Sequence, residues 1–180
     1  MFLKWCNLKE LIRILFVGFL LYLFVLTSSA YSKVLDHKYK KINHKQTINT
    51  ITTKYKVNNK LASKIVASAD KAGNKHDIDP KIILSVIAVE SMFQPNATNK
   101  VTKTAGLMQL DHKVHNKRLK GRNVYDVEHN IDIGTELLAE LIDKYNNINV
   151  ALSRYLGSSK KIDQRYITKV NNHYNTLATQ

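Results

Sequence analysis

The sequence predicts an all-α domain, and three observations lead to this fold class. Apolar residues recur at spacings of three and four residues in several segments, which places them on one face of a helix. Residues that begin helices stand just before such segments, as in Asp79-Pro80, where Asp suits the cap position and Pro the first helical position. No stretch alternates apolar and polar residues for long enough to predict a sheet.

The first thirty residues are predicted to be a signal peptide. Lys4, Lys9 and Arg13 give a positive opening, residues 14–26 carry no charge, and small residues lead up to Ala30. The apolar run would span about 20 Å as a helix, against ~30 Å of bilayer hydrocarbon. We therefore expect cleavage after Ala30, with an uncleaved anchor as the alternative. In both cases the rest of the chain is exported to the periplasm or cell envelope.

Residues 31–58 are polar, rich in Lys, Asn and Thr, and lack a sustained helical period. This composition predicts a basic, flexible leader, with a short strand over residues 50–53 as an alternative. The domain itself is expected over residues 59–180.

The domain is predicted to begin with a helix capped by Asn59, continuing through Ala72 and ending at Gly73. A second helix starts at Asp79-Pro80 and carries Glu90. A polar, mixed region is expected over residues 112–122. The remaining helices are predicted over residues 107–110, 130–145, 150–155 and 166–177.

The chain is strongly basic, with 28 Lys and Arg against 14 Asp and Glu and a formal net charge of +14. This balance favours a polyanionic partner such as nucleic acid, anionic lipid or a cell wall. The export signal argues against nucleic acid as the partner. Contact with the membrane is expected only through the signal segment. The single cysteine, Cys6, excludes an intramolecular disulfide.

Glu90 lies on the apolar face of the second predicted helix. Burial and the negative end of the helix dipole both penalise its charged form, so they favour a protonated carboxyl. General acid catalysis of glycosidic-bond cleavage requires such a group. The alternative is a glutamate that turns its carboxylate to water. The apolar residues that share its face are Ile82, Ile83, Val86 and Ile87.

A set of residues from Glu90 onward resembles the signature of the lytic transglycosylase (SLT) domain of the lysozyme superfamily. The resemblance covers about two thirds of the chain, from near Asn58 to the C-terminus. It implies a lysozyme-like helical domain, similar to goose-type lysozyme, with Glu90 as the catalytic residue. The residues that carry it are Glu90-Ser91, Phe93, Pro95, Ala97 and Gly106-Leu107-Met108-Gln109.

The resemblance also implies substrate-binding residues. It places Gln109 in hydrogen-bond range of a saccharide and Met108 against a sugar face. Tyr155 and Tyr166 match tyrosines that border the sugar cleft. The alternative is structural: a core Met beside a helix start, and two core tyrosines. Further matches, expected to be structural, are Tyr125-Asp126, Asn130-Ile131 and Gly134.

Three departures from the family pattern stand out. Leu156 replaces the Asn that follows the active-site Tyr, and Asp163 stands where many members carry a Glu. The loop before Gly106 is one residue longer, so the family's substrate-binding Ser has no certain match; Asn99 and Thr102 are the candidates.

Other catalytic chemistry finds little support. No His-Glu-x-x-His motif or cysteine pair predicts a metal site, so neither metal nor cofactor is expected. Ser91 lies on a helix instead of a strand-to-helix elbow, and its hydroxyl is expected to bond the backbone four residues back.

The resemblance implies cleavage of the bond between N-acetylmuramic acid and N-acetylglucosamine in peptidoglycan glycan strands, with formation of a 1,6-anhydro sugar. Glu90 alone suffices because the substrate supplies the nucleophile, whereas ordinary glycosidases need two carboxylates. The alternatives are a hydrolytic lysozyme and a non-catalytic wall-binding or assembly protein. The small size of the chain favours service to a secretion or conjugation apparatus, with a phage particle or general wall turnover as alternatives.

Overall fold

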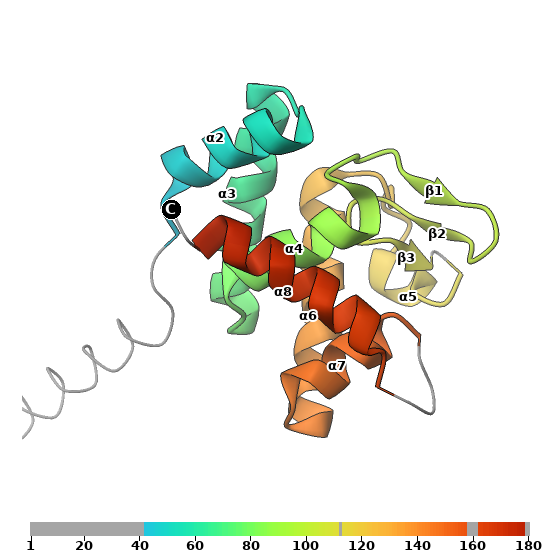
Figure 1. The fold of residues 1–180 in the computed structure, drawn as a ribbon. Coiled ribbons are helices and arrows are strands. Elements are labelled where there is room, and N and C mark those ends of the chain that lie inside the picture. Colours follow the sequence, from blue (N-terminus) through green and yellow to red (C-terminus); the bar gives the residue numbers. More distant parts are fainter. Residues whose placement is uncertain (1–41, 112, 158–161, 179–180) are drawn as a thin grey trace, which may run out of the picture. The chain divides into compact units, whose positions relative to one another are not determined.

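A computed structural model describes residues 42–111, 113–157 and 162–178 (Figure 1). The predicted signal peptide, and the leader up to residue 41, lie outside the described residues. Within the described part, helices dominate and the only sheet is small, so the predicted all-α class is confirmed. No helix in that part combines the length and apolar character needed to cross a bilayer.

Helix α2 (His44–Tyr55) occupies part of the segment predicted to be a flexible leader, and it replaces the alternative strand over residues 50–53. Asn43 caps it by accepting a hydrogen bond from the backbone N–H of Gln46. Its buried face is partly made of threonines, Thr47 and Thr50, and the Thr50 hydroxyl donates to the Gln46 carbonyl. Because threonine counts as polar in a hydropathy pattern, these residues do not show a helical period of apolar positions in the sequence.

Helix α3 (Asn59–His76) begins one residue earlier than predicted, since Asn58 and not Asn59 is the cap, and it runs past Gly73. Gly73 lies inside the helix, and glycine is required there because the turn that follows the helix packs closely against it. A Cβ there would come within 2.5 Å of the Ile78 carbonyl oxygen. The helix ends instead at Asp77, which adopts the left-handed conformation.

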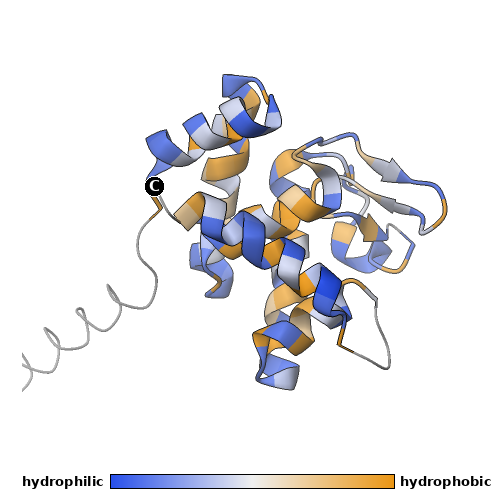
Figure 2. Cartoon of the chain, in the orientation of Figure 1, coloured by the Kyte–Doolittle hydropathy of each residue, from blue (hydrophilic) through white to orange (hydrophobic). Residues whose placement is uncertain are grey.

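Helix α4 (Pro80–Ser91) starts as predicted, with the Asp79 carboxylate accepting from the Lys81 N–H. It is the most apolar helix of the fold (Figure 2) and packs against both α3 and α8 (Gln164–Ala178). Most of its side chains are buried. The core is therefore built around the helix that carries Glu90.

After α4 the chain forms a small antiparallel sheet of three two-residue strands, which the sequence did not predict. The strands are β1 (Thr98–Asn99), β2 (Thr104–Ala105) and β3 (Leu110–Asp111), paired in that order. Thr104 pairs with Asn99 on one side and Asp111 on the other. The helix predicted over residues 107–110 is wrong, because Gly106 and Gln109 both have positive φ and turn the chain into β3.

The remaining helices are α5 (Asn116–Leu119), α6 (Val127–Tyr145), α7 (Ile148–Tyr155) and α8. Helix α6 starts three residues before its predicted position, because the Asp126 carboxylate caps it through the His129 N–H. Helix α6 packs against α3 and α7, and α8 lies along α4 (Figure 1).

Candidate active site

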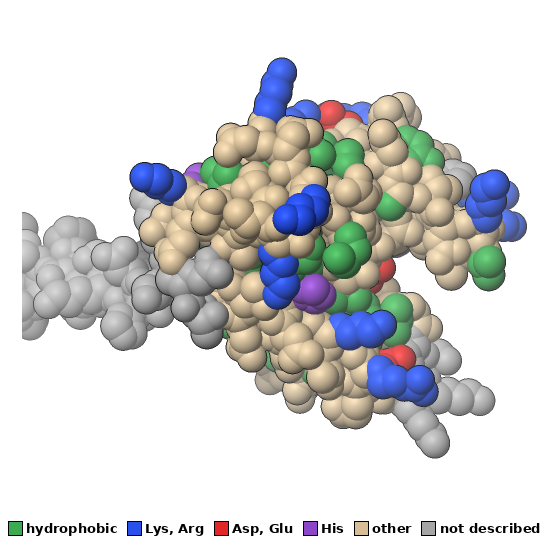
Figure 3. Space-filling model, turned by 45° about the horizontal axis from the view of Figure 1, so that its top comes forward, with side chains coloured by type: hydrophobic (Ala, Val, Ile, Leu, Met, Phe, Trp, Pro, Cys, Tyr) green, Lys and Arg blue, Asp and Glu red, His purple; other side chains and the backbone are tan. Residues whose placement is uncertain are grey.

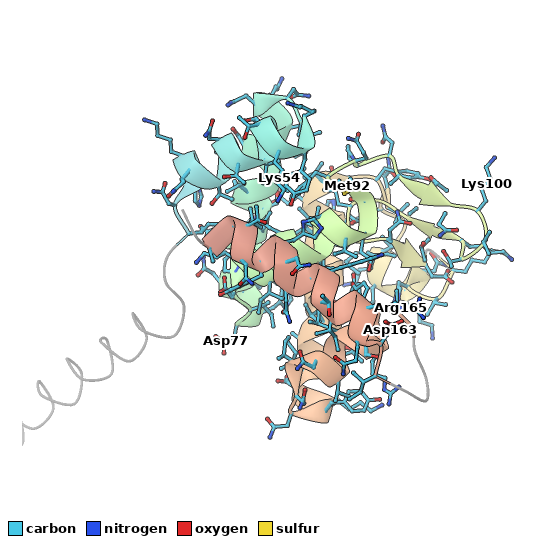
Figure 4. All side chains as sticks on the ribbon, viewed as in Figure 1. Lys54, Asp77, Met92, Lys100, Asp163 and Arg165 are labelled. Atoms are coloured by element: carbon cyan, nitrogen blue, oxygen red, sulfur yellow. The ribbon has the colours of Figure 1, made fainter. Side chains whose placement is uncertain are left out.

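Glu90 lies in the last turn of α4, just before the chain reverses. The reversal occurs because Met92 and Phe93 both adopt positive φ, at 50° and 62°. The Met92 N–H donates to the Ala88 carbonyl and closes the helix, while its side chain is exposed (Figure 4). Phe93 is fully buried and anchors the turn, so the position of Glu90 is fixed by the core beside it.

Glu90 is half-buried, and burial raises the pKa of its carboxyl above the ordinary value. The Tyr166 hydroxyl donates a hydrogen bond of 2.6 Å to Oε1 of Glu90, which acts in the opposite direction and lowers that pKa. Burial is the larger effect. The carboxyl therefore holds its proton to higher pH than an exposed glutamate, as predicted.

Tyr166 is positioned by the first turn of α8. Its backbone N–H donates to the Asp163 carboxylate, whose own N–H donates to the Ser153 hydroxyl at the end of α7. The ring of Tyr166 is buried, and burial together with the charge of Glu90 raises the pKa of its hydroxyl. The phenol therefore remains a proton donor to Glu90. Asp163 thus caps a helix, which gives it a structural function.

Tyr155, at the end of α7, donates from its hydroxyl to the Met108 carbonyl at 2.9 Å. Burial, and after it the charge of Glu90, raises the pKa of this hydroxyl well above its usual range. The influence of Glu90 on both tyrosines shows that α4, α7 and α8 bring these three predicted site residues together.

The Gly106–Gln109 loop is held beside Glu90 by buried hydrogen bonds. The Ser91 hydroxyl donates to the Ile87 carbonyl, as predicted, and also to the Leu107 carbonyl. Asn130 of α6, fully buried, accepts from the Met108 N–H and donates to the Ala105 and Val124 carbonyls. The predicted structural function of Asn130 is thus visible in its contacts.

Two glycines of the predicted motif are required by this packing. Gly106 has a φ of +83°, and a Cβ there would come within 2.2 Å of Nδ2 of Asn130. A Cβ on Gly134 of α6 would come within 2.5 Å of Sδ of Met108. Both positions therefore exclude any side chain without rearrangement.

The structure differs from the sequence-based expectation at Met108. Its side chain has no exposed surface and packs over Gly134, so it cannot lie against a sugar face in this conformation. The alternative interpretation, a core methionine, matches the observed position. Only the backbone carbonyl of Met108 is directed toward the site, where it accepts from Tyr155.

Gln109 also has its polar atoms engaged within the protein. Its amide nitrogen donates to the Ala97 and Gly106 carbonyls, and its carbonyl oxygen accepts from the Thr104 hydroxyl. These bonds join the β1–β2 hairpin to the loop. The contact to a saccharide that the resemblance implies would therefore compete with them.

The candidates for the missing Ser lie on the hairpin. The Asn99 side chain accepts from the Val101 and Thr102 N–H groups, and the Thr102 and Thr104 hydroxyls bond each other. These contacts build the hairpin turn. Leu156, which replaces the family's Asn, follows Tyr155 and is 44% exposed.

The support that α2 provides to this site was not predicted from the sequence. Tyr55 packs edge-on against Phe93 with ring centroids 4.6 Å apart, and its hydroxyl lies 2.6 Å from Nδ1 of His173 on α8. Helix α2 precedes every recognisable motif, so only the threonine and Tyr55 spacing could have revealed it. Within the described residues, no group of His, Cys, Asp or Glu is arranged to hold a metal ion.

Comparison with known proteins agrees with this geometry. Residues 67–176 match the family described as the transglycosylase SLT domain. A protein named "Transglycosylase" from Enterobacteria phage PRD1 is 35% identical over 98 residues, covering 54% of this chain and 36% of that protein. The "Membrane-bound lytic murein transglycosylase C" of Photorhabdus laumondii is 31% identical over 96 residues, covering 48% of this chain and 27% of that protein.

The chain thus spans about a third or less of the length of these relatives. The family match covers more than half of the chain and includes Glu90, Met108, Gln109, Tyr155 and Tyr166. Together with the helical architecture, it confirms the predicted lysozyme-like, all-α fold class. The chain belongs to the transglycosylase SLT domain family.

Proposed function

We propose that this protein is a peptidoglycan lytic transglycosylase that uses Glu90 as both acid and base. The observation that carries the proposal is the half-buried Glu90 carboxyl, whose pKa is raised by burial and which is held by the Tyr166 hydroxyl. The names of the relatives add support, since those proteins are called transglycosylases. Tyr155 and Tyr166 are proposed to border the sugar cleft, as the family pattern implies.

A mechanism with one carboxyl fits the contacts of the three aspartates that were candidates for a second catalytic group. Asp126 caps α6, and Asp132 is paired with Lys75 and His76. Asp111 accepts from the Lys113 and Val114 N–H groups. Among the residues that the structure describes, no second carboxylate contributes to the pKa shift of Glu90. A classical pair of acid and nucleophile therefore has no visible second member.

The proposed reaction needs no water. Protonated Glu90 donates its proton to the glycosidic oxygen as the bond from that oxygen to C1 of N-acetylmuramic acid breaks. The resulting Glu90 carboxylate accepts the proton of the muramic 6-hydroxyl, whose oxygen forms a new bond to C1. The hydrogen bond from Tyr166 stabilises the carboxylate between the two steps. Because the 6-hydroxyl belongs to the same sugar, its proximity replaces a second protein group.

The proposal is tested by Glu90→Gln and by the identity of the product. The amide keeps the shape of the side chain but cannot act as an acid, so wall lysis by the full chain should fall by at least ~10²–10⁴-fold. Mass spectrometry of digested peptidoglycan should find fragments that end in 1,6-anhydro-N-acetylmuramic acid, lighter by one water than hydrolysed ones. Undiminished lysis by a folded Glu90→Gln variant would refute the assignment.

The product also separates the alternatives. Fragments with reducing ends would identify a hydrolytic lysozyme, because water would then attack C1. No fragments at all, from folded protein on several wall types, would favour a wall-binding or assembly protein. A substrate with an O-acetylated muramic 6-hydroxyl should resist the proposed reaction, whereas a hydrolase does not require that hydroxyl.

We further propose that the protein acts in the cell envelope as a specialised enzyme. The signal predicted over residues 1–30 supports export, and the word "membrane-bound" in the name of one relative agrees with an envelope site. The positive charge, spread as single lysines and arginines over the face in Figure 3, suits an anionic wall. Service to a secretion or conjugation apparatus, or to a phage particle, can be tested by identifying the genes beside its own.

A further inference from the structure

A pocket of about 310 Å³ lies between α3 and α6, apart from the Glu90 site. None of the residues that line it is a predicted substrate-binding residue. Its floor is made of small side chains, Ser68 and Ala72, both buried. Its volume is at the lower end of the range of small-ligand pockets, which is roughly 300–1,000 Å³.

The rim of the pocket is charged, and its acidic groups are already neutralised. Glu128 accepts from Lys71, and Asp132 accepts from Lys75 and His76. These pairs cross from α3 to α6 and hold the two helices together. A cation would have to displace them, so the pocket does not favour one.

The unused hydrogen-bonding capacity of the pocket consists largely of donors. The guanidinium of Arg122 has neither an ion-pair nor a hydrogen-bond partner among the described residues. The Ser68 hydroxyl is likewise without a partner there, although the residue is only 8% exposed. Lys71 and Lys75 retain N–H groups beyond those used by the carboxylates.

Ser68 is a buried residue whose hydroxyl has no protein partner, and this oxygen is open to solvent, because every fully buried side-chain oxygen and nitrogen of the described residues is hydrogen-bonded. A serine inside a helix can instead bond a carbonyl of the preceding turn. In this chain Ser85 and Ser91 do so, at the Lys81 and Ile87 carbonyls. Ser68 leaves that bond unmade and lines the pocket instead. Its hydroxyl is therefore available to a ligand.

We propose that this pocket binds a small oxyanion group, a carboxylate or a phosphate, through Arg122 and Ser68. Arginine offers a planar set of N–H donors that matches both groups, and charge-assisted bonds of this kind are the stronger ones. The backbone at Arg122 is fixed by its N–H donating to the Leu119 carbonyl at 2.8 Å, so the side chain starts from a defined position. The proposal is independent of the reaction assigned to Glu90.

The test is a calorimetric titration of the full chain, purified in a non-ionic detergent at low salt. Inorganic phosphate and succinate are titrated separately, and the tighter of the two identifies the preferred group. Arg122→Gln should weaken binding by about tenfold or more, as expected for the loss of a hydrogen bond to a charged group. Ser68→Ala should weaken it less, since only one neutral donor is lost.

Arg165→Gln is the matched control, because Arg165 is an exposed arginine at the start of α8 (Figure 4) and does not line the pocket. It should bind as the wild type does. Glu90→Gln should also keep the affinity, which separates this pocket from the proposed active site. Equal losses in Arg122→Gln and Arg165→Gln would indicate only general attraction to a basic surface. That outcome, or the absence of saturable binding of both anions, would overturn the proposal.

Discussion

The hydroxyl of Tyr166 donates a hydrogen bond of 2.6 Å to Oε1 of Glu90, and so joins α8 to the end of α4. Burial favours the protonated carboxyl, whereas this bond favours the ionised one. The pKa of Glu90 is therefore set by two opposed effects, of which burial is the larger. A group that has to give up a proton and then take one back benefits from such a compromise.

Tyr166→Phe should raise the pKa of Glu90 further, because it removes the effect that lowers it. The buried hydrogen bond lost should cost about 1 kcal/mol of stability. The alkaline limb of the pH–activity profile should move to higher pH, since Glu90 would stay protonated for longer. A carbon-13 NMR titration of the Glu90 carboxyl measures the shift directly.

Tyr174→Phe is the control for this substitution. Tyr174 lies on the same helix and donates from its hydroxyl to the Asp79 carboxylate at 2.8 Å, at the opposite end of α4. It should lose a similar amount of stability and leave the titration of Glu90 unchanged. If both variants shift that titration equally, the change is a general effect of loosening α8.

Glu90→Gln should increase stability at neutral pH. In the folded chain the pKa of Glu90 is raised above the ordinary 4.5, chiefly by burial. Between that ordinary value and the raised one, the folded state binds more protons than the unfolded state, so stability falls as pH rises. Glutamine does not titrate, so the stability of the variant does not fall with pH through this group.

The measurement is the melting temperature of both proteins from about pH 4, just below the ordinary glutamate pKa, up to about pH 8. The advantage of Glu90→Gln should grow as pH increases through the raised pKa and should shrink toward pH 4. Other titrating groups are common to both proteins and cancel in the difference. A wild type more stable than the variant at pH 8 would show that burial does not dominate.

Gln109→Glu separates a structural function of Gln109 from a substrate contact. The amide now donates to the Ala97 and Gly106 carbonyls, and a carboxylate would leave both without that donor. We expect a loss of about 2 kcal/mol or more in a urea unfolding experiment. Gln94→Glu, an exposed change in the nearby turn, should cost little. Unchanged stability with reduced activity would instead support the substrate contact.

The helix around Glu90 could be predicted because its signals are local. Asp79-Pro80 fixes the start, and the apolar spacing places Glu90 on the buried face. Asn130 and Gly134 were expected to be structural, and each has the contacts of such a residue. Much of the helical fold could therefore be predicted from local capping residues and from the spacing of apolar residues.

What could not be predicted depends on contacts between distant segments. Met108 turns into the core because Gly134, 26 positions later, leaves room for it. Gln109 takes a positive φ of 47°, which is uncommon for a residue with a side chain, because its amide bonds the hairpin. The β1–β3 strands are too short to show alternation. None of these features leaves a periodic trace in the sequence.

Gly134→Ala should destabilise the domain by about 1–3 kcal/mol, the usual cost of overpacking. The new methyl group would come within 2.5 Å of Sδ of Met108. Met108→Ala alone should also destabilise it, by about 2–5 kcal/mol, because it leaves a cavity. The double variant should lose less than the sum, since the shorter side chain makes room for the methyl group. Strict additivity in urea unfolding would show that the two residues do not share this space.

Helix α2 should be necessary for the stability of the domain, although it lies outside residues 67–176 that match the family. Tyr55 is 8% exposed and packs against Phe93, the buried residue of the turn that follows Glu90. Tyr55→Ala should therefore cost about 3–5 kcal/mol, as for other buried aromatic residues. Tyr55→Phe keeps the ring and loses only the hydrogen bond with His173, so about 1 kcal/mol is expected.

Tyr125→Ala is the control for Tyr55→Ala, because Tyr125 is 36% exposed and its hydroxyl has one hydrogen-bond partner within the described residues, the Thr98 hydroxyl. It should cost much less. Urea unfolding gives the free energies, and activity at a temperature where all variants are folded shows whether the Glu90 turn has moved. If residues 44–55 were a dispensable leader, Tyr55→Ala would cost no more than Tyr125→Ala. A large loss confined to Tyr55→Ala would instead establish that α2 supports the end of α4 through Phe93.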